Sequence, residues 1–153
     1  MKGEKGMKFS ICNELFEGWK LDDIFKYAAE LGYDGVEIAH FTICDSVTEV
    51  SKSERQRIKS TAESVGIDVV GIHWVLVSPK GLHISHPDEE IRRKTRDYLH
   101  ELIDFCADIG GKIIVFGSPQ NRNVIKPFTY QQAWDSAKET FMSCCPHAEE
   151  RNV

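Results

Sequence analysis

The chain has 153 residues, with 19 lysines and arginines against 24 aspartates and glutamates and a formal net charge of -5. This length suits one domain with a sizeable core. The mildly acidic balance counts against a nucleic-acid surface, which needs a concentrated basic patch. No apolar stretch reaches the roughly 18 to 20 residues of a membrane span, and the N-terminus lacks the apolar core of a signal peptide. We therefore expect a cytoplasmic protein with no nucleic-acid and no membrane partner.

The five cysteines are interpreted as reduced thiols. Their number is odd, and the chain carries no secretion signal that would favour a disulfide framework. Most lie in apolar surroundings, where a thiol packs as a small hydrophobic group. We assign a packing role to all five: Cys12, Cys44, Cys106, Cys144 and Cys145.

Strand-like and helix-like segments alternate along the chain. Four apolar runs rich in β-branched residues predict buried strands. In chain order these strands span residues 8–12, 35–39, 68–77 and 112–116. Each is followed by a segment whose apolar side chains recur at helical spacing. In the same order these helices span residues 21–31, 51–66, 87–109 and 129–141.

The helix ends carry the residue types that favour them. Ser51 with Glu54, and Thr129 with Gln132, have the spacing of capping boxes. Pro87 suits a first helical position, and a glycine follows each of the first three helices.

The alternation predicts an α/β fold with a parallel sheet, because parallel neighbours need a long crossover connection. A dinucleotide-binding sheet is disfavoured because the first strand–helix connection, residues 13–20, has a single glycine. A complete (βα)8 barrel has about 250 residues, or roughly 31 for each unit. Strand starts at residues 8, 35, 68 and 112 give spacings of 27, 33 and 44 residues. We predict a TIM-barrel-type (βα)4 half-barrel, truncated before strand five.

Four segments resemble the first half of the sugar phosphate isomerase/epimerase family, whose members are xylose isomerase-like TIM barrels. The segments are residues 8–12, 31–38 (LGYDGVEI), 69–73 (VVGIH) and 106–112 (CADIGGK). LGYDGVEI is the strongest marker among them. The resemblance covers residues 7–153, interpreted as the N-terminal half of such a barrel, and residues 1–6 are interpreted as an N-terminal leader.

The resemblance implies isomerisation or epimerisation of a small sugar or sugar phosphate. In such enzymes a divalent metal (Mn2+, Mg2+, Co2+ or Zn2+) is bound by carboxylates and a histidine at the C-terminal ends of strands five to eight. Two acidic groups there move a proton beside the substrate carbonyl, with the metal's assistance. Because the chain stops before those strands, we expect no metal ligand and no catalytic base within it, and no turnover by the chain alone.

Glu37 and His73 are candidate substrate-binding residues in the second and third strands. An ionised carboxylate inside an apolar strand is costly unless it is paired or faces a polar cavity. Glu37 therefore either binds substrate or positions a metal-site neighbour from inside the barrel, or else makes a structural hydrogen bond to an adjacent strand or loop. Because side chains alternate along a strand, either His73 or Trp74 points inward. An inward His73 would contact a sugar hydroxyl or carbonyl, whereas a satisfied core histidine is the alternative; Trp74 is assigned to packing.

The connection after the fourth strand, residues 117–123, concentrates polar groups at the face where barrel active sites form. Ser118, Gln120 and Arg122 are candidate substrate-binding residues for hydroxyls or a phosphate. An ordinary polar loop would have the same composition. After the first strand, Phe16 and Trp19 would form an apolar wall over a sugar or else pack on a helix.

Three further histidines lie between predicted elements. His40 has no identified partner and is assigned to a loop. His83 and His86 have a spacing that would suit a metal, but no nearby Cys, Asp or Glu completes a set before the next helix, so a solvent-facing loop is preferred. The segment that contains them, residues 78–87, is a candidate lid over the barrel mouth.

Two other functions compete with that of an incomplete enzyme. A self-associating half-barrel is one, because unpaired sheet edges and an uncovered apolar face favour association. A fragment of an apurinic endonuclease-like protein is the other, and the net charge of -5 and the lack of a histidine in the fourth strand count against it. The expected partners are a small carbohydrate and either a second copy of the chain or a C-terminal half.

Overall fold

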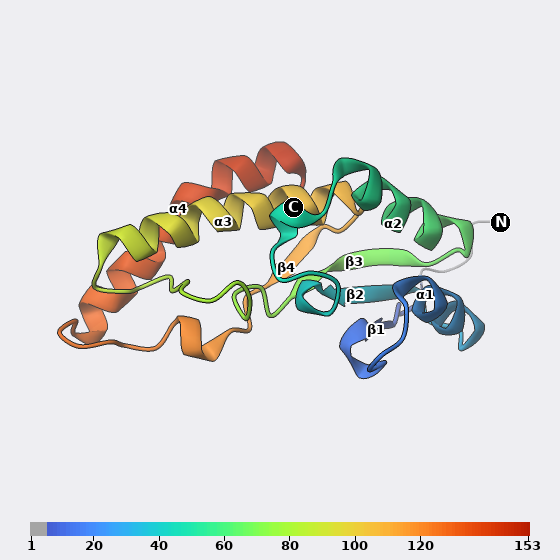
Figure 1. The fold of residues 1–153 in the computed structure, drawn as a ribbon, viewed down its shortest axis with the longest axis horizontal. Helices are drawn as coiled ribbons and strands as arrows, with labels where there is room; N and C mark the ends of the chain where they lie inside the picture. Colours follow the sequence, from blue (N-terminus) through green and yellow to red (C-terminus); the bar gives the residue numbers. More distant parts are fainter. Residues whose placement is uncertain (1–5) are drawn as a thin grey trace.

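The computed structural model describes residues 6–153, which form one parallel four-stranded sheet alternating with four helices (Figure 1). The strands pair in sequence order β1-β2-β3-β4, all parallel. They are β1 (Ser10–Cys12), β2 (Gly35–Ala39), β3 (Asp68–His73) and β4 (Ile113–Val115). The helices are α1 (Leu21–Glu30), α2 (Lys52–Ser64), α3 (Glu89–Asp108) and α4 (Tyr130–Arg151). The predicted (βα)4 order is confirmed.

Short 3-10 helices follow most strands at their C-terminal ends. They are η1 (Asn13–Leu15), η2 (His40–Thr42), η3 (Val47–Glu49) and η4 (Pro119–Asn121). Asn13 anchors two of these connections, because its side chain donates to Thr42 Oγ1 at 2.8 Å and accepts from the Ala39 backbone N–H at 2.7 Å. The C-terminal edge of the sheet is therefore held by polar side chains, as well as by the strand ladder.

Several element boundaries differ from the predicted ones. β3 ends at His73, four residues early, because Trp74 adopts a left-handed backbone conformation with φ 55° that cannot continue a strand. α3 begins at Glu89, after Pro87, since Asp88 caps it by accepting from the Glu90 N–H at 2.9 Å. α4 continues to Arg151, beyond Phe141, the last apolar position of its predicted stripe.

The two predicted capping boxes have different outcomes. Thr129 and Gln132 make both bonds of the box at the start of α4. Ser51 accepts from the Glu54 N–H at 3.2 Å, but the Glu54 carboxylate binds the Arg57 guanidinium instead of the backbone at Ser51. Only one of the two bonds of the Ser51–Glu54 box is therefore present.

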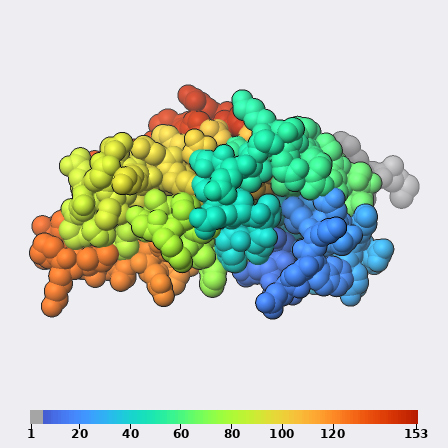
Figure 2. Space-filling view, viewed as in Figure 1, coloured from blue at the N-terminus to red at the C-terminus, as the bar shows by residue number. Residues whose placement is uncertain are grey.

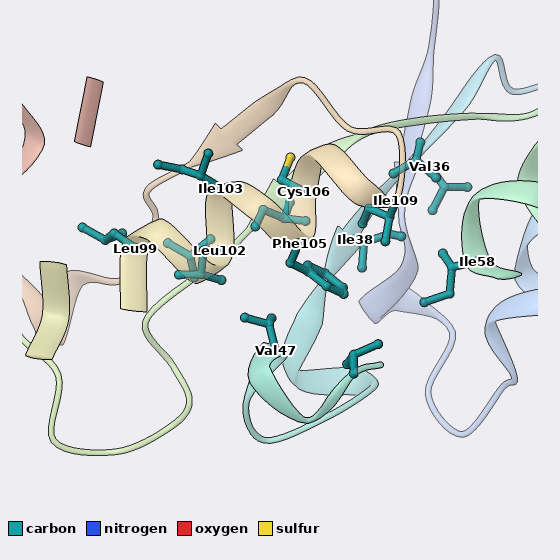
Figure 3. Close-up of a cluster of buried hydrophobic side chains, with 14 of the residues drawn as sticks. Val36, Ile38, Val47, Ile58, Leu99, Leu102, Ile103, Phe105, Cys106 and Ile109 are labelled. Carbon is teal, nitrogen blue, oxygen red and sulfur yellow. The ribbon is translucent and has the colours of Figure 1, made fainter. Parts of the chain in front are cut away.

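The hydrophobic core lies between one face of the sheet and the helices (Figure 3). Ile38 of β2, Ile58 of α2 and Phe105 of α3 are at most 1% exposed. Gly71 permits the close approach of β3 to β4, because a Cβ at this position would lie 2.0 Å from the carbonyl oxygen of Ile113. All five cysteines are unpaired, as predicted, and burial raises the pKa of Cys106 to about 11.

The other face of the sheet is open. Glu37 is in register with Cys12 on one side and with Gly71 on the other, and β3 places His73 beside Val115. Val115 and its neighbour on this face, Ile113, are 45% and 53% exposed. In the space-filling view the first strand–helix unit (blue) and the connection before α4 (orange) lie at opposite ends of an elongated molecule (Figure 2). Among residues 6–153 we find no helix whose length and apolarity would let it cross a membrane.

Candidate functional site

Three side chains from adjacent strands meet on the open face of the sheet. Cys12 ends β1, Glu37 lies in the middle of β2 and His73 ends β3. The His73 Nδ1 atom lies 3.0 Å from Glu37 Oε1. One donor atom from each of the three residues lies within 4.8 Å of the other two. The structure thus brings together the two strand residues predicted as substrate ligands and adds a thiol to them.

A second carboxylate approaches the same histidine from the connection after β1. Glu14 belongs to η1, and its Oε1 atom lies 3.4 Å from His73 Nε2. Sequence reasoning missed Glu14 and assigned Cys12 to packing. Their position at the C-terminal end of the first strand was the available signal, because C-terminal ends of parallel strands share one edge of a sheet.

His73 is buried without aligned hydrogen bonds. It is 6% exposed, and neither ring nitrogen makes a hydrogen bond although each has a carboxylate oxygen nearby. The two distances are short, but neither contact has the geometry of a hydrogen bond. A buried polar group without a partner costs about 1–3 kcal/mol, and a ligand at this position would offset that cost.

The acidic surroundings also act on the thiol. Burial raises the pKa of Cys12, and the nearby carboxylates of Glu37 and Glu14 raise it further because they oppose a thiolate. Cys12 therefore carries its proton near neutral pH in the absence of a cation. An added positive charge would reverse this preference.

A cavity of about 910 Å3 lies beside the group, under the connections that follow β1 and β2. Glu14 belongs to its lining, which connects the cavity to His73. Aromatic rings supply much of the remaining wall: Phe16, Trp19, Phe41 and Trp74. The cavity combines flat apolar surfaces with an acidic group, a composition suited to a small polar ligand with apolar faces.

The aromatic residues of this wall pack in pairs. Phe16 and Trp19 have ring centroids 5.5 Å apart, and Phe41 and Trp74 have centroids 6.0 Å apart. Trp19 is 51% exposed and Trp74 45% exposed, so both present a free surface. Trp74 was assigned to packing, but its left-handed backbone turns it out of β3 and into the cavity wall.

The three candidates after β4 lie apart from this cavity. Ser118 is 1% exposed, and its hydroxyl accepts a hydrogen bond from the Leu76 N–H at 3.0 Å, joining the connections after β3 and β4. Gln120 and Arg122 are exposed. None of the three lines the aromatic cavity. The bond made by Ser118 gives this hydroxyl a structural task, and the substrate role of the three residues stays a prediction.

The three histidines predicted to lie in connections have local partners. His40 is fully buried, its Nε2 lies 3.1 Å from the Ser78 carbonyl oxygen, and burial lowers its pKa. The prediction of a solvent-facing His83 is wrong, because His83 is 5% exposed and its Nε2 lies 2.9 Å from Asn123 Oδ1. His86 is half-buried, and its ring accepts from the Asp88 N–H.

The candidate lid over residues 78–87 is tied to its neighbours. The Ile84 N–H donates to the Asn121 carbonyl at 2.9 Å, and the Asn121 side chain donates to the Leu82 carbonyl at 2.8 Å. Leu82 and Ile84 are both buried. The segment is thus a packed part of the domain in this structure.

Comparison with known proteins adds a family model and solved structures. The model described as xylose isomerase-like TIM barrel matches residues 25–153. A crystal structure of D-psicose 3-epimerase in the presence of D-fructose superposes with a TM-score of 0.80 at 18% identity, over 96% of this chain and 50% of that one. A 3-keto-D-glucoside 4-epimerase from E. coli gives a TM-score of 0.72 at 18% identity, over 97% of this chain and 54% of that one.

An L-ribulose 3-epimerase gives a TM-score of 0.75 at 16% identity, over 96% of this chain and 48% of that one. The chain thus spans about half the length of the solved structures that it resembles. No curated protein sequence matches it.

Proposed function

Because the chain belongs to the xylose isomerase-like TIM barrel family, we propose that it is the N-terminal half of a divalent-metal-dependent isomerase or epimerase of a small sugar or sugar phosphate. The observation that carries the proposal is the Glu37–His73 contact at the C-terminal edge of the sheet, beside an aromatic cavity. Active sites of TIM barrels form at this edge. The structural neighbours named as sugar epimerases support the substrate class.

The aromatic wall and the polar pair would bind different parts of one sugar. The rings of Trp19 and Trp74 offer apolar surfaces for the C–H faces of the ligand. The Glu37 carboxylate accepts hydrogen bonds from hydroxyl groups, and the ring nitrogens of His73 supply a further polar contact for the sugar. Such an arrangement orients a carbonyl sugar, which is the contribution that this half would make to catalysis.

The oxygen-preferring metals among those of such enzymes, Mg2+ and Mn2+, do not fit the donor set of this half. A divalent metal in such enzymes polarises the substrate carbonyl, and the resemblance places its carboxylate and histidine ligands on strands five to eight. The group found here contains the Cys12 thiol, whereas Mg2+ and Mn2+ prefer oxygen ligands. In the proposed reaction we therefore assign substrate binding and orientation to the residues of this chain.

Binding of a ketose by the isolated chain tests the proposal. Tryptophan fluorescence is followed during titration with D-psicose, D-fructose and their phosphates. The expected result is a saturable change that Trp19→Ala weakens by at least roughly fivefold, the loss of one stacking contact worth about 1 kcal/mol. Trp134→Ala is the matched control, because Trp134 is 58% exposed on α4 and does not line the cavity. No saturable change with any of these sugars, or an equal loss in both variants, would contradict the proposal.

A second candidate function is self-association of the half-barrel, which the open face favours. Ile113 and Val115 present apolar surface there, and β1 and β4 are the unpaired edges of the sheet. A second copy of the chain would bring a surface of the same kind and two further edges. Because two-fold contacts are self-complementary, such a dimer closes upon itself.

A further inference from the structure

We propose that Cys12, Glu37 and His73 bind a thiophilic divalent metal ion, with Zn2+ the best fit. This site lies in the first three strands, so it is distinct from the metal site that the family resemblance places on strands five to eight. The proposal rests on the geometry of the three side chains and is independent of the sugar substrate.

The donor set matches zinc in kind and number. Zinc sites that keep an open position have three protein ligands drawn from thiolate sulfur, imidazole nitrogen and carboxylate oxygen. Cys12, Glu37 and His73 supply one of each, within 4.8 Å of one another. Ligand atoms around tetrahedral zinc lie roughly 3.3–3.8 Å apart, given bond lengths of about 2.0–2.3 Å. Small side-chain rotations therefore complete the site, because the three strands already fix the Cα positions.

The state of His73 is the second observation that points to a ligand. The ring is buried, yet both nitrogens lack aligned hydrogen bonds. Nδ1 lies toward Glu37 and Nε2 toward Glu14. In metal sites the histidine nitrogen that does not bind the ion commonly donates to a carboxylate, which fixes the ring. Glu14 is therefore placed as the positioning residue for a His73 that binds metal through Nδ1.

Electrostatics favour a cation at this point. Two carboxylates, Glu14 and Glu37, lie against a buried imidazole and a thiol, with no ion pair to lysine or arginine for either carboxylate among residues 6–153. Binding of Zn2+ would form the sulfur–metal bond and release the Cys12 thiol proton to solvent, with no change of oxidation state. The fourth position would be left to water or to a hydroxyl of a ligand in the adjoining cavity.

Cobalt is the probe for the experiment, because tetrahedral Co2+ has visible bands and a thiolate–cobalt contact adds a charge-transfer band in the near ultraviolet. Untagged protein is titrated with Co2+, and then Zn2+ is added to displace it. We expect one equivalent of Co2+ with the thiolate band. Cys12→Ser should abolish that band, and Glu14→Gln should weaken affinity roughly 10-fold, as for other carboxylates that orient metal-binding histidines. Cys145→Ser is the matched control, because Cys145 is an exposed thiol on α4.

Alkylation of the wild-type protein decides the matter if Cys12→Ser does not fold. Zn2+ should slow modification of Cys12, located by mass spectrometry, and leave that of Cys145 unchanged. A Co2+ spectrum without the thiolate band, or a band that persists in folded Cys12→Ser, would overturn the proposal. Equal protection of Cys12 and Cys145 would do the same. Since no sugar is present, these results do not depend on the proposed function.

Discussion

At the scale of single residues, the C-terminal edge of the sheet holds some side chains that face the open side and others that are buried and bind the backbone. Glu37 and His73 meet on the open face, where neither makes an aligned hydrogen bond with the other. Ser118, predicted from the same reasoning, is buried and bonds to the Leu76 backbone. The position of a residue at a strand end therefore predicts the region of the site but does not give the direction of its side chain.

Ser118→Ala should separate a structural from a substrate-binding role. Removal of the hydroxyl leaves the buried Leu76 N–H without an acceptor, at a cost of about 1–3 kcal/mol in the free energy of unfolding. Urea denaturation measures this change. Gln120→Ala is the control, expected within about 0.5 kcal/mol because Gln120 is exposed. A Ser118→Ala protein of unchanged stability and weaker sugar binding would show that Ser118 contacts the substrate.

His40 should make stability fall in mild acid. Burial lowers its pKa below the ordinary value of 6.5, so the unfolded chain binds the proton first as the pH decreases. The contribution of the neutral ring is complete above pH 6.5 and is lost progressively below it. The observable is the difference in free energy of unfolding between pH 7.5 and pH 5.5, which should be smaller in His40→Asn than in the wild type.

His86→Asn serves as the comparison for this pH effect, because His86 is half-buried and lies in a loop. An unchanged pH dependence in His40→Asn would show that acid sensitivity comes from other groups.

At the scale of elements, strand order was predictable and strand length was not. The alternation of apolar runs and helical segments predicts parallel pairing, which the ladder β1-β2-β3-β4 confirms. The apolar run continues from His73 to Val77, so no hydropathy signal marks the end of β3. That end depends on the backbone of Trp74, whose ring packs over Gly117 and beside Phe41. These contacts are long-range and are not visible in a local pattern.

The connection over residues 78–87 shows the same limit. Its polar composition is typical of a mobile lid, but Asn121 and Asn123 bind it from nearly 40 positions away in the chain. Pairing between two connections depends on the packing of the whole sheet edge. Sequence reasoning therefore located the segment and missed its partners.

Gly71→Ala should disrupt the pairing of β3 with β4. The added Cβ would lie 2.0 Å from the Ile113 carbonyl oxygen, a distance that forces the strands apart. We expect the free energy of unfolding to fall by about 1–3 kcal/mol, as measured by thermal or urea unfolding. Gly6→Ala is the matched control, because a Cβ at Gly6 meets nothing within 4 Å. Equal stability of the two variants would mean that β4 does not lie as close to Gly71 of β3 as the structure shows.

At the scale of the whole molecule, the fold is one half of a TIM barrel with its inner face open. The solved structures of the same fold are about twice as long as the region that this chain matches. Apolar side chains at 45–53% exposure, as in Val115 and Ile113, are a reason for association through this face.

The open face should control the association state of the isolated chain. Light scattering should give a mass that rises with concentration above the monomer value of 17.4 kDa. Val115→Lys should shift the equilibrium toward monomer, because a charge would be buried in the contact. Trp134→Lys, on an exposed position of α4, should leave it unchanged. A wild-type protein that stays at 17.4 kDa at all concentrations would exclude self-association through this face.

In the proposed function, this half binds and orients a sugar without carrying the groups that transfer its proton. One NMR sample in D2O, containing the chain, a ketose and Mn2+, tests both parts. We expect saturation transfer from the protein to the ketose and no deuterium incorporation beside the carbonyl. Absence of saturation transfer would contradict the proposed binding site, and incorporation of deuterium would show that the chain has its own catalytic base.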